Sequence, residues 1–258
     1  MKKKTQPANK NSSWESVSSW YDKLVGSKGH YYHEKVILPK LHNLFSVYRP
    51  SALLDLACGQ GILSRILPDE VTYTGVDASH SLLQAAKKHS RNKKHTFYQQ
   101  DLTQPLDLQK KDFDVATILL ALQNIPDPLA VMKSAWAHLK PNSRFVLVLN
   151  HPCFRIPRQT SWMVDEEKKI QYRRVDRYLT PLTIPIQAHP SQGEKSVQTF
   201  SYHYSLSAIS SMLQKAGFVI ELMEEWCCDR QSTGPKGKME NRSRNEIPMF
   251  LAIVAMKI

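Results

Sequence analysis

A short apolar run that leads into a pair of glycines constrains the fold of this chain more than any other segment. Residues 52–57 are predicted to form a buried strand, and Cys58-Gly59-Gln60-Gly61 follows it directly as a turn. Gly59 can adopt φ values that other residues avoid, and the missing side chains at Gly59 and Gly61 let a ligand approach the backbone. The segment therefore predicts a strand, a ligand-binding turn and the start of a helix.

Further apolar runs place this strand in a larger sheet. We predict four more strands before the middle of the chain, at residues 71–77, 96–99, 113–119 and 145–150. Between them, residues 79–89 and 127–139 carry apolar side chains at helical spacing. Strands that alternate with helices are typical of a parallel sheet with helices on both faces. The pattern predicts an α/β fold of the doubly wound, Rossmann-like type.

The segment before the sheet has a different composition. Residues 1–12 are predicted to be a disordered basic tail that opens with three lysines, and residues 13–50 a helical N-terminal cap. Helices are expected at 13–24 and 31–45, the second broken by Pro39. The tail lacks the apolar core of a signal peptide, and no apolar run is long enough to span a bilayer. We therefore expect a cytoplasmic protein.

The alternating pattern stops at residue 151 and resumes only near residue 204. Since structureless loops of this length are uncommon inside compact domains, residues 151–204 are predicted to form a substrate lid inserted into a domain of residues 51–258. The rest of the domain is predicted as a helix, a strand, a polar gap and a last strand, at residues 206–215, 218–226, 228–245 and 248–256.

Three aspartates end or follow successive predicted strands, namely Asp55, Asp77 and Asp101. In a doubly wound sheet they would meet at the carboxyl edge, where an acid after the second strand can accept both hydroxyls of an adenosine ribose. Helix capping by Asp77 is the alternative, although Ser79 can also cap. A dinucleotide fingerprint needs a third glycine where Ser64 stands, and Asp55 would repel the phosphates. The charges therefore favour a cationic adenosyl ligand, S-adenosylmethionine, over NAD.

At these same positions the chain resembles a known family. The segments LDLACGQG, GVD and QD, at residues 54–61, 75–77 and 100–101, resemble motifs I, II and III of the class I S-adenosylmethionine-dependent methyltransferases. Residues 113–127 are similar to the ubiquinone/menaquinone methyltransferase branch, also called methyltransferase type 11. The resemblance implies a seven-stranded, mostly parallel sheet whose last strand is antiparallel. It also implies these cofactor-binding residues: Asp55, Ala57, Gly59, Gly61, Asp77, Ala78, Asp101, Leu102 and Leu119.

Segments expected above the carboxyl edge supply the candidates for the acceptor side. His151, which follows the fifth strand, is the candidate general base because histidine titrates near neutral pH. Tyr21 is the second catalytic candidate, because a tyrosine ring can close over a sulfonium. The candidate substrate-binding residues are Tyr32, His33, Gln123, Arg155 and Tyr172. The open alternatives are simple packing for the cap aromatics, a structural role for His151 and a salt-bridged lid face around Tyr172.

Composition separates the function classes only in part. Half of the formal net charge of +12 lies in residues 1–50, and no separate RNA-binding module is visible. The four cysteines lack metal-ligand spacing, so no metal is predicted. We expect a methyltransferase acting on a small molecule, either anionic or aromatic. Gln123 stands where the quinone enzymes carry arginine, and they lack the insertion, which argues against a quinone. The alternatives are an RNA or protein methyltransferase, a non-catalytic adenosyl-ligand-binding protein and an oxidoreductase.

Overall fold

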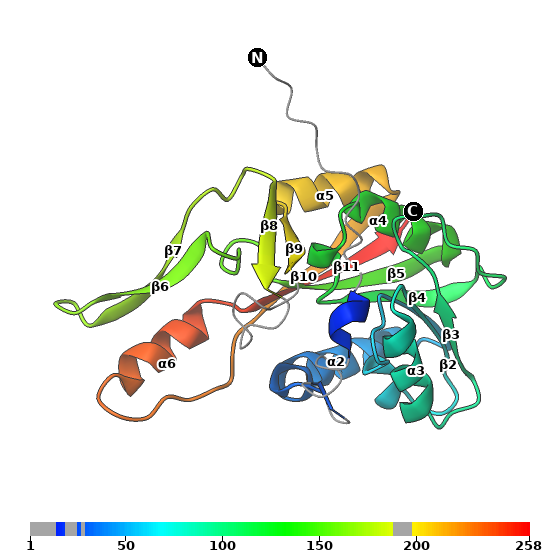
Figure 1. Ribbon diagram of the computed structural model, residues 1–258, viewed down its shortest axis with the longest axis horizontal. Helices are drawn as coiled ribbons and strands as arrows, with labels where there is room; N and C mark the ends of the chain where they lie inside the picture. Colours follow the sequence, from blue (N-terminus) through cyan, green and yellow to red (C-terminus); the bar gives the residue numbers. More distant parts are fainter. Residues whose placement is uncertain (1–13, 19–24, 27–28, 188–197) are drawn as a thin grey trace, which may run out of the picture.

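A single seven-stranded sheet forms the centre of the molecule. The computed structural model describes residues 14–18, 25–26, 29–187 and 198–258, and the strands lie in the order β10-β11-β5-β4-β1-β2-β3 (Figure 1). Their bounds are β1 Ala52–Leu56, β2 Thr72–Asp77, β3 His95–Gln99, β4 Phe113–Leu119, β5 Leu139–Asn150, β10 Phe218–Trp226 and β11 Phe250–Lys257. Strand β11 runs antiparallel to both neighbours, and the other adjacent pairs are parallel. The predicted seven-stranded, mostly parallel sheet is confirmed.

Helices cover both faces of this sheet, as predicted. On one face, α4 (Pro128–His138) and α5 (Leu206–Lys215) pack Val131 and Leu213 against the strands. On the other face, α2 (Leu38–Tyr48) and α3 (His80–His89) pack Leu41 and Leu83 (Figure 1). Successive residues of a strand point to opposite faces, so each central strand contributes to both cores. Burial on both faces explains why these strands read as continuous apolar runs.

Three local expectations are wrong. The turn after β1 leads into η3 (Leu63–Arg65), a single 3₁₀ turn, and not into an α-helix. Pro39 does not break the N-terminal helix, because a wider π-helical segment, η2 (His33–Ile37), precedes it and α2 continues without a gap. The polar gap before the last strand contains α6 (Gly237–Glu246), whose only fully buried residues are Gly237 and Ser243. A helix that buries so little has no apolar stripe to reveal it in the sequence.

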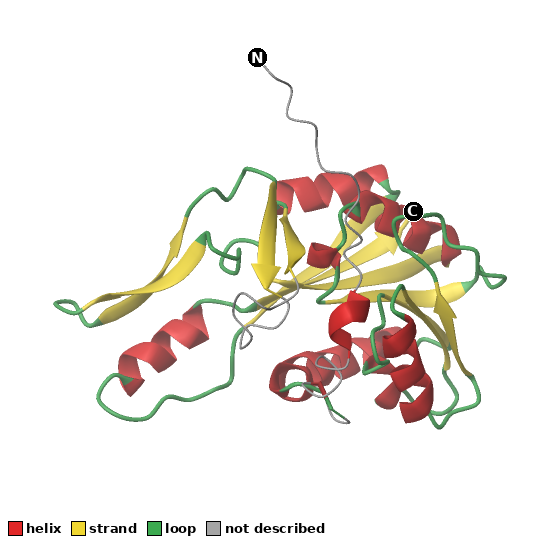
Figure 2. Cartoon of the chain, in the orientation of Figure 1, coloured by secondary structure: helices red, strands yellow, loops and turns green. Residues whose placement is uncertain are grey.

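The insertion after β5 consists of two antiparallel strand pairs. Strands β6 (Thr160–Asp165) and β7 (Ile170–Val175) form a hairpin, and β8 (Leu182–Gln187) pairs with β9 (Gln198–His203). The β6–β7 hairpin and α6 lie side by side and extend from the body (Figure 2). The Ser243 hydroxyl donates to Gln171 Oε1 at 2.6 Å, and Lys236 pairs with Glu166 at 2.6 Å. These contacts join two segments that are distant in the sequence into one arm.

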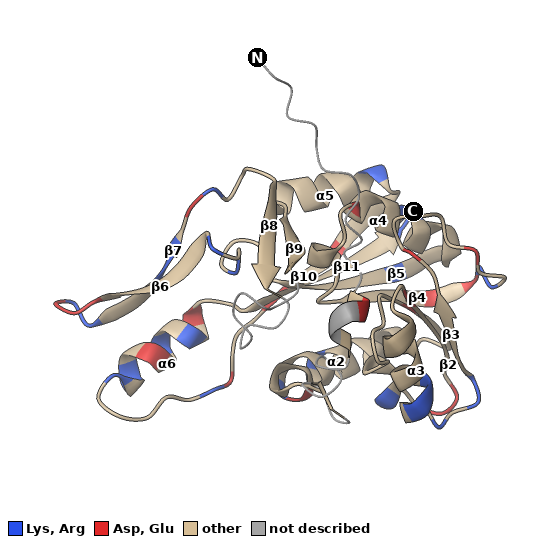
Figure 3. Ribbon diagram, in the orientation of Figure 1, with Lys and Arg blue, Asp and Glu red and all other residues tan. Residues whose placement is uncertain are grey.

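Charged residues of both signs mix on this arm. Figure 3 shows lysine, arginine and acidic residues alternating along α6. Arg244 pairs with Glu240 at 3.2 Å, and Arg174 pairs with Asp176 at 3.6 Å. A mixed, salt-bridged surface is not the single-signed stripe that nucleic-acid binding requires. Within the described ranges, no helix is both long and apolar enough to cross a membrane. The predicted tail 1–12 lies outside the described residues.

Candidate active site

At the carboxyl edge of the sheet, the turns after β1 and β4 each contain a residue in a strained backbone conformation. In the sheet, β2 and β3 lie on one side of β1, whereas β4 and β5 lie on the other side. The strand order therefore reverses between β1 and β4. Such a reversal creates the crevice in which ligands of open α/β sheets bind. Ala57 after β1 and Leu120 after β4 both have positive φ, +54° and +52°. Strained residues of this kind concentrate at functional sites, which marks this edge as the candidate site.

Asp77, at the end of β2, organises the glycine turn. The Gly59 amide donates to Asp77 Oδ2 at 2.8 Å, and the Ser79 amide donates to Oδ1 at 2.9 Å. Ser79 itself caps α3, since its hydroxyl accepts from the Leu82 amide. Asp77 is therefore not the cap of that helix, but a buried carboxylate that fixes the turn beside it. Burial raises its pKa, while the hydrogen bonds from Ser79 and Gly59 oppose this shift.

Asp55 is a second buried carboxylate at the same edge. Its oxygens accept the Tyr73 hydroxyl and the Thr117 hydroxyl, both at 2.7 Å, and only 2% of the residue is exposed. Burial raises the pKa of Asp55 to about 6 from an ordinary 3.8, although both hydroxyls oppose the shift. Among the described residues, no basic side chain forms an ion pair with Asp55 or Asp77. The edge thus holds two buried acids without a counter-cation from the described part of the chain.

These residues fit an adenosyl ligand that carries a positive charge. Buried acids without a counter-cation favour a cation and repel phosphates. Beside them, Gln60 Nε2 is a buried donor without a partner, whereas Gln60 Oε1 accepts from Arg65 at 2.8 Å. An amino-acid carboxylate would satisfy that donor, and S-adenosylmethionine carries one. Sequence reasoning missed Gln60, although a polar residue between two turn glycines was the available signal.

The other predicted cofactor residues lie along the same edge in different environments. Ala78 is exposed directly after Asp77, and Leu119 is half-buried at the end of β4. Asp101 is exposed, and its Oδ1 accepts the amide and hydroxyl of Thr103 at 2.9 and 2.8 Å. Leu102 is buried in the core beneath. Contacts of these residues, and of Ala57, Gly59 and Gly61, with a cofactor stay predictions.

The N-terminal cap reaches this edge through a residue that the sequence did not single out. Glu15, in η1 (Trp14–Val17), accepts the Ser79 hydroxyl at 2.6 Å and the Ser81 amide at 3.2 Å. Those hydroxyl and amide bonds lower the pKa of Glu15. A carboxylate at the first turn of α3 also interacts favourably with the helix dipole. The contact places the cap beside Asp77. The catalytic candidate Tyr21 lies outside the described residues.

Within the N-terminal cap, Tyr32 directly precedes η2 and His33 is its first residue. The Tyr32 ring lies edge-on to Phe250, with centroids 5.8 Å apart. His33 is 8% exposed, and burial, with His30 and Arg65 nearby, lowers its pKa to about 4. Its Nδ1 is buried without a partner. His33 is therefore a neutral ring at working pH.

His151 is held on both ring nitrogens. Its Nε2 lies 2.7 Å from Glu225 Oε1 on β10, and the Cys153 amide donates to Nδ1 at 3.2 Å. An Nδ1 that accepts requires the proton on Nε2, where it faces Glu225. Burial lowers the pKa of His151, against the opposing effect of Glu225. His151 is 1% exposed, and its ring joins the end of β5 to β10. To act as a base, it would have to break its hydrogen bond with Glu225 or with the Cys153 amide. The base role stays a prediction.

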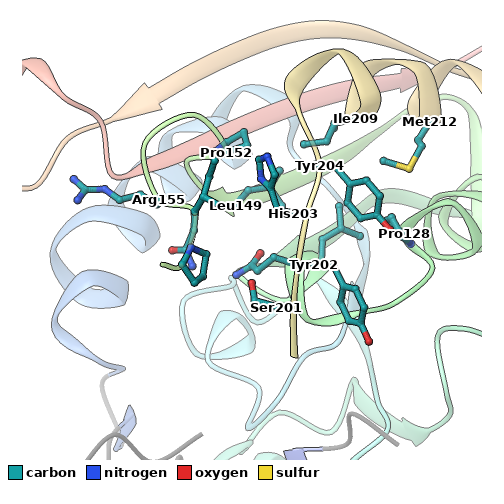
Figure 4. Close-up of a pocket in the computed structure, with 15 residues that line it drawn as sticks. Pro128, Leu149, Pro152, Arg155, Ser201, Tyr202, His203, Tyr204, Ile209 and Met212 are labelled. Carbon is teal, nitrogen blue, oxygen red and sulfur yellow. The ribbon is translucent and has the colours of Figure 1, made fainter. Parts of the chain in front are cut away.

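A cavity of about 50 Å³ lies where β5 meets the insertion (Figure 4). This volume holds about three or four water-sized groups. Gln123 lines it, and Gln123 Oε1 is a buried acceptor without a partner, while its Nε2 donates to Leu120 O at 2.7 Å. Its other lining residues come from the end of β5, the following loop, β9, α4 and α5, and include Leu149, Asn150, Pro152, Arg155, Ser201, Tyr202, His203, Tyr204, Ile209 and Met212.

The predicted substrate residues divide into two groups. Gln123 and Arg155 both line the cavity. Tyr172 does not line the cavity. It lies opposite Met163 in the β6–β7 hairpin, and 45% of its surface is exposed. The neighbours of Tyr172 in the register, Arg173 and Trp162, face the other side of the ribbon. The structure therefore brings Gln123 and Arg155 together and leaves Tyr172 on the outer face.

Comparison with known proteins agrees with this geometry. A family model described as a methyltransferase domain matches residues 29–222. The demethylmenaquinone methyltransferase of Lactococcus lactis is 27% identical over 216 residues, which cover 80% of each chain. The ubiquinone biosynthesis O-methyltransferase of Histophilus somni is 35% identical over 97 residues, 35% of this chain and 41% of the relative. An S-adenosylmethionine-dependent methyltransferase from Mesorhizobium loti superposes with a TM-score of 0.65 at 25% identity, covering 85% of this chain and 96% of the other.

Proposed function

The chain belongs to the methyltransferase-domain family, as an S-adenosylmethionine-dependent enzyme, and we propose that it methylates a small molecule bound between β5 and the insertion. The observation that carries the proposal is the cavity at the carboxyl ends of β4 and β5, on the same edge as the glycine turn. Its lining contains Gln123 Oε1, a buried polar atom without a partner among the described residues. Unpaired polar groups in a partly apolar cavity are suited to orient a small ligand.

The chain's own residues would act mainly by binding and alignment. S-adenosylmethionine supplies a methyl group activated by the positive charge of its sulfonium. The turn at Gly59, fixed by Asp77, would hold the adenosyl group, and Gln60 Nε2 would donate to its carboxylate. Buried Asp55 and Asp77 would favour the positive charge in this water-poor edge. Alignment of two reactants can contribute up to roughly 7–11 kcal/mol in ideal cases, so no catalytic triad is required.

A general base is required only for an acceptor that must lose a proton. His151 is the proposed base, but its hydrogen bonds to Glu225 and Cys153 favour a structural role for it. His151→Gln distinguishes these roles. A base predicts that turnover falls while the dissociation constant for S-adenosylhomocysteine stays unchanged. Full retention of turnover on the true acceptor would exclude the base.

The relatives support a small-molecule acceptor without defining it. One relative is named for demethylmenaquinone and another for ubiquinone biosynthesis, and both names refer to small molecules. The insertion supplies Ser201, Tyr202 and His203 to the cavity. Because the insertion forms so much of the wall, we propose an acceptor other than a quinone.

Labelled methyl transfer into fractionated cell extract tests the proposal. Purified protein and S-adenosylmethionine labelled in its methyl group are incubated with separate small-molecule, RNA and protein fractions. We expect label in the small-molecule fraction only, and none with heat-inactivated protein. Label confined to the RNA or protein fraction would contradict the proposed acceptor class while leaving the methyltransferase activity intact.

A further inference from the structure

Three arginines gather around aromatic rings on the far side of the cavity wall. The guanidinium carbons of Arg155 and Arg173 lie 5.4 and 5.1 Å from the centre of the Trp162 ring. The guanidinium of Arg230 lies 4.2 Å from the Tyr31 ring and 5.4 Å from the Tyr32 ring. Both Arg155 and Arg230 act electrostatically on Tyr32, so the two sets adjoin. We call Arg155, Trp162, Arg173, Tyr32 and Arg230 the arginine–aromatic cluster.

None of these three arginines forms an ion pair within the part of the chain that the structure describes. Arg173 donates only to neutral oxygens, those of Phe154 O at 2.7 Å and Thr160 Oγ1 at 2.9 Å. Arg155 Nε is buried without any partner. By contrast, Arg174 lies next in sequence on the opposite face of the ribbon and pairs with Asp176. Among the described residues, the missing ion-pair partner is therefore specific to the face of the β6–β7 hairpin that carries Trp162 and Arg173.

Partial burial without an anion is unfavourable for Arg155 and Arg173, whereas Arg230 is exposed. Burial lowers the pKa of Arg155, and burial together with the charge of Arg155 lowers the pKa of Arg173 to about 10. Desolvating a charge is costly unless an opposite charge accompanies it. Contact with Trp162 offsets only part of that cost, since a cation–π contact is weaker than a pairing with an opposite charge. A fold that keeps both cations at this place is suited to an anion from outside the chain.

We infer that the arginine–aromatic cluster binds an oxyanion, a carboxylate or a phosphate, on the methyl acceptor, an assignment that rests on the proposed function. Arg155 connects the two places, because it lines the cavity while its guanidinium extends away from the other labelled residues (Figure 4). The reacting end of the acceptor then occupies the cavity, and its acidic end lies against Arg155 and Arg173. A guanidinium donates two parallel bonds to either oxyanion, so the two share one recognition chemistry.

Thermal unfolding of the protein saturated with S-adenosylhomocysteine tests this inference. The probes are benzoate, phenyl phosphate and the neutral isostere benzamide. We expect at least one anion to raise the melting temperature by about 2–4 °C, and benzamide to leave it unchanged. Benzoate and phenyl phosphate separate a carboxylate from a phosphate preference. Equal shifts with benzamide, or no shift with either anion, would overturn the inference.

Arg155→Met and the control Arg174→Gln locate the site. Arg155→Met should abolish the anion shift and raise the melting temperature of the ligand-free protein by about 2–4 °C, because it removes a buried, unpaired charge. Arg174→Gln should keep the anion shift. If Arg155→Met does not fold, Arg173→Gln replaces it and should reduce the shift at least twofold. Retention of the full anion shift without Arg155 would overturn the inference, whatever the stability of the variant.

The dissociation constant for S-adenosylhomocysteine, measured on the same proteins, separates this inference from the proposed function. A wild-type protein that binds S-adenosylhomocysteine but shows no anion shift contradicts only the oxyanion site. A wild-type protein that does not bind S-adenosylhomocysteine contradicts the proposed function. Arg155→Met should bind it as tightly as the wild type does, because Arg155 lies at the acceptor end.

Discussion

The two ends of the carboxyl edge carry groups of opposite charge, which are buried at one end and partly buried at the other. At β1 and β2, Asp55 and Asp77 are 2% and 9% exposed. At the insertion, Arg155 and Arg173 surround Trp162. Neither pair has an ion-pair partner among the described residues. Each end is therefore complementary to a ligand of the opposite charge, a sulfonium at one and an oxyanion at the other.

The two ends also differ in how they are built. Asp55 is fixed by neighbouring strands of the central sheet, through Tyr73 on β2 and Thr117 on β4. Asp77, at the end of β2, is fixed by the amides of Gly59 and Ser79. The arginines depend on a loop and a hairpin inserted after β5. An arrangement fixed by the sheet should persist when the insertion changes, whereas the arginine end should change with it. Cofactor binding and the choice of acceptor should therefore be separable in this molecule.

Asp77→Ala should have the largest effect on the acidic end. It removes the acceptor of the Gly59 and Ser79 amides and the proposed partner of the ribose hydroxyls. We expect the dissociation constant for S-adenosylhomocysteine to rise about 100-fold, or about 3 kcal/mol, by calorimetry. Asp112→Asn is the control, since this exposed acid pairs with Lys110 and precedes β4 at the opposite edge. Equal affinities of the wild type and Asp77→Ala for S-adenosylhomocysteine would contradict the assignment of the acidic end to cofactor binding.

Asp55→Asn should stabilise the ligand-free protein. The folded-state pKa of about 6 exceeds the ordinary 3.8, so the folded protein binds this proton more tightly than the unfolded chain does. The stability contributed by the bound proton is present below pH 3.8 and is lost as the pH rises through 6. The variant should therefore exceed the wild type by about 2–3 kcal/mol in unfolding free energy above pH 6. Denaturant unfolding across pH 4.5–8 measures this difference, and a constant difference at all pH values would contradict it.

His33→Gln should have the opposite pH dependence and a similar or smaller size. Burial lowers the pKa of His33 to about 4, so the unfolded chain binds this proton more tightly. The wild type therefore loses stability as the pH falls from about 6.5 toward 4, by about 3 kcal/mol. The variant should lose less over the same range. The measurement is the unfolding free energy of both proteins between pH 4 and 7. If it decreases equally in the wild type and in His33→Gln, His33 can be protonated without cost in the folded protein.

Glu15→Gln should have the smallest effect. The substitution weakens the contacts with Ser79 and Ser81 that hold η1 beside Asp77. We expect the dissociation rate of S-adenosylhomocysteine to rise about two- to threefold, as typical for weakening an exposed charged hydrogen bond. Glu34→Gln, which alters an exposed acid paired with Lys35, serves as the control. An unchanged dissociation rate in Glu15→Gln would contradict a contribution of the cap to the cofactor site.

The acidic end was more predictable from the sequence than the basic end. Strands β1, β2 and β4 are buried on both faces, so their apolar runs and the aspartates in them revealed the edge. Arg155 was recognised as a candidate, but the contact with Trp162 and Arg173 depends on the register of β6 and β7, which mixed polar residues do not reveal. Glu15 acts through tertiary contacts that no local pattern indicates, whereas Gln60, between two turn glycines, could have been singled out from the sequence.

Proton release on cofactor binding tests the central claim most directly. A buried acid with a pKa of about 6 is about half protonated at pH 6, and a bound cation favours its ionised form. Calorimetric titration of S-adenosylmethionine at pH 6, in buffers of different ionisation enthalpy, should show release of about half a proton per site. The release should vanish in Asp55→Asn. A binding enthalpy independent of buffer in the wild type, or proton uptake, would contradict the pairing of this acidic end with a cation.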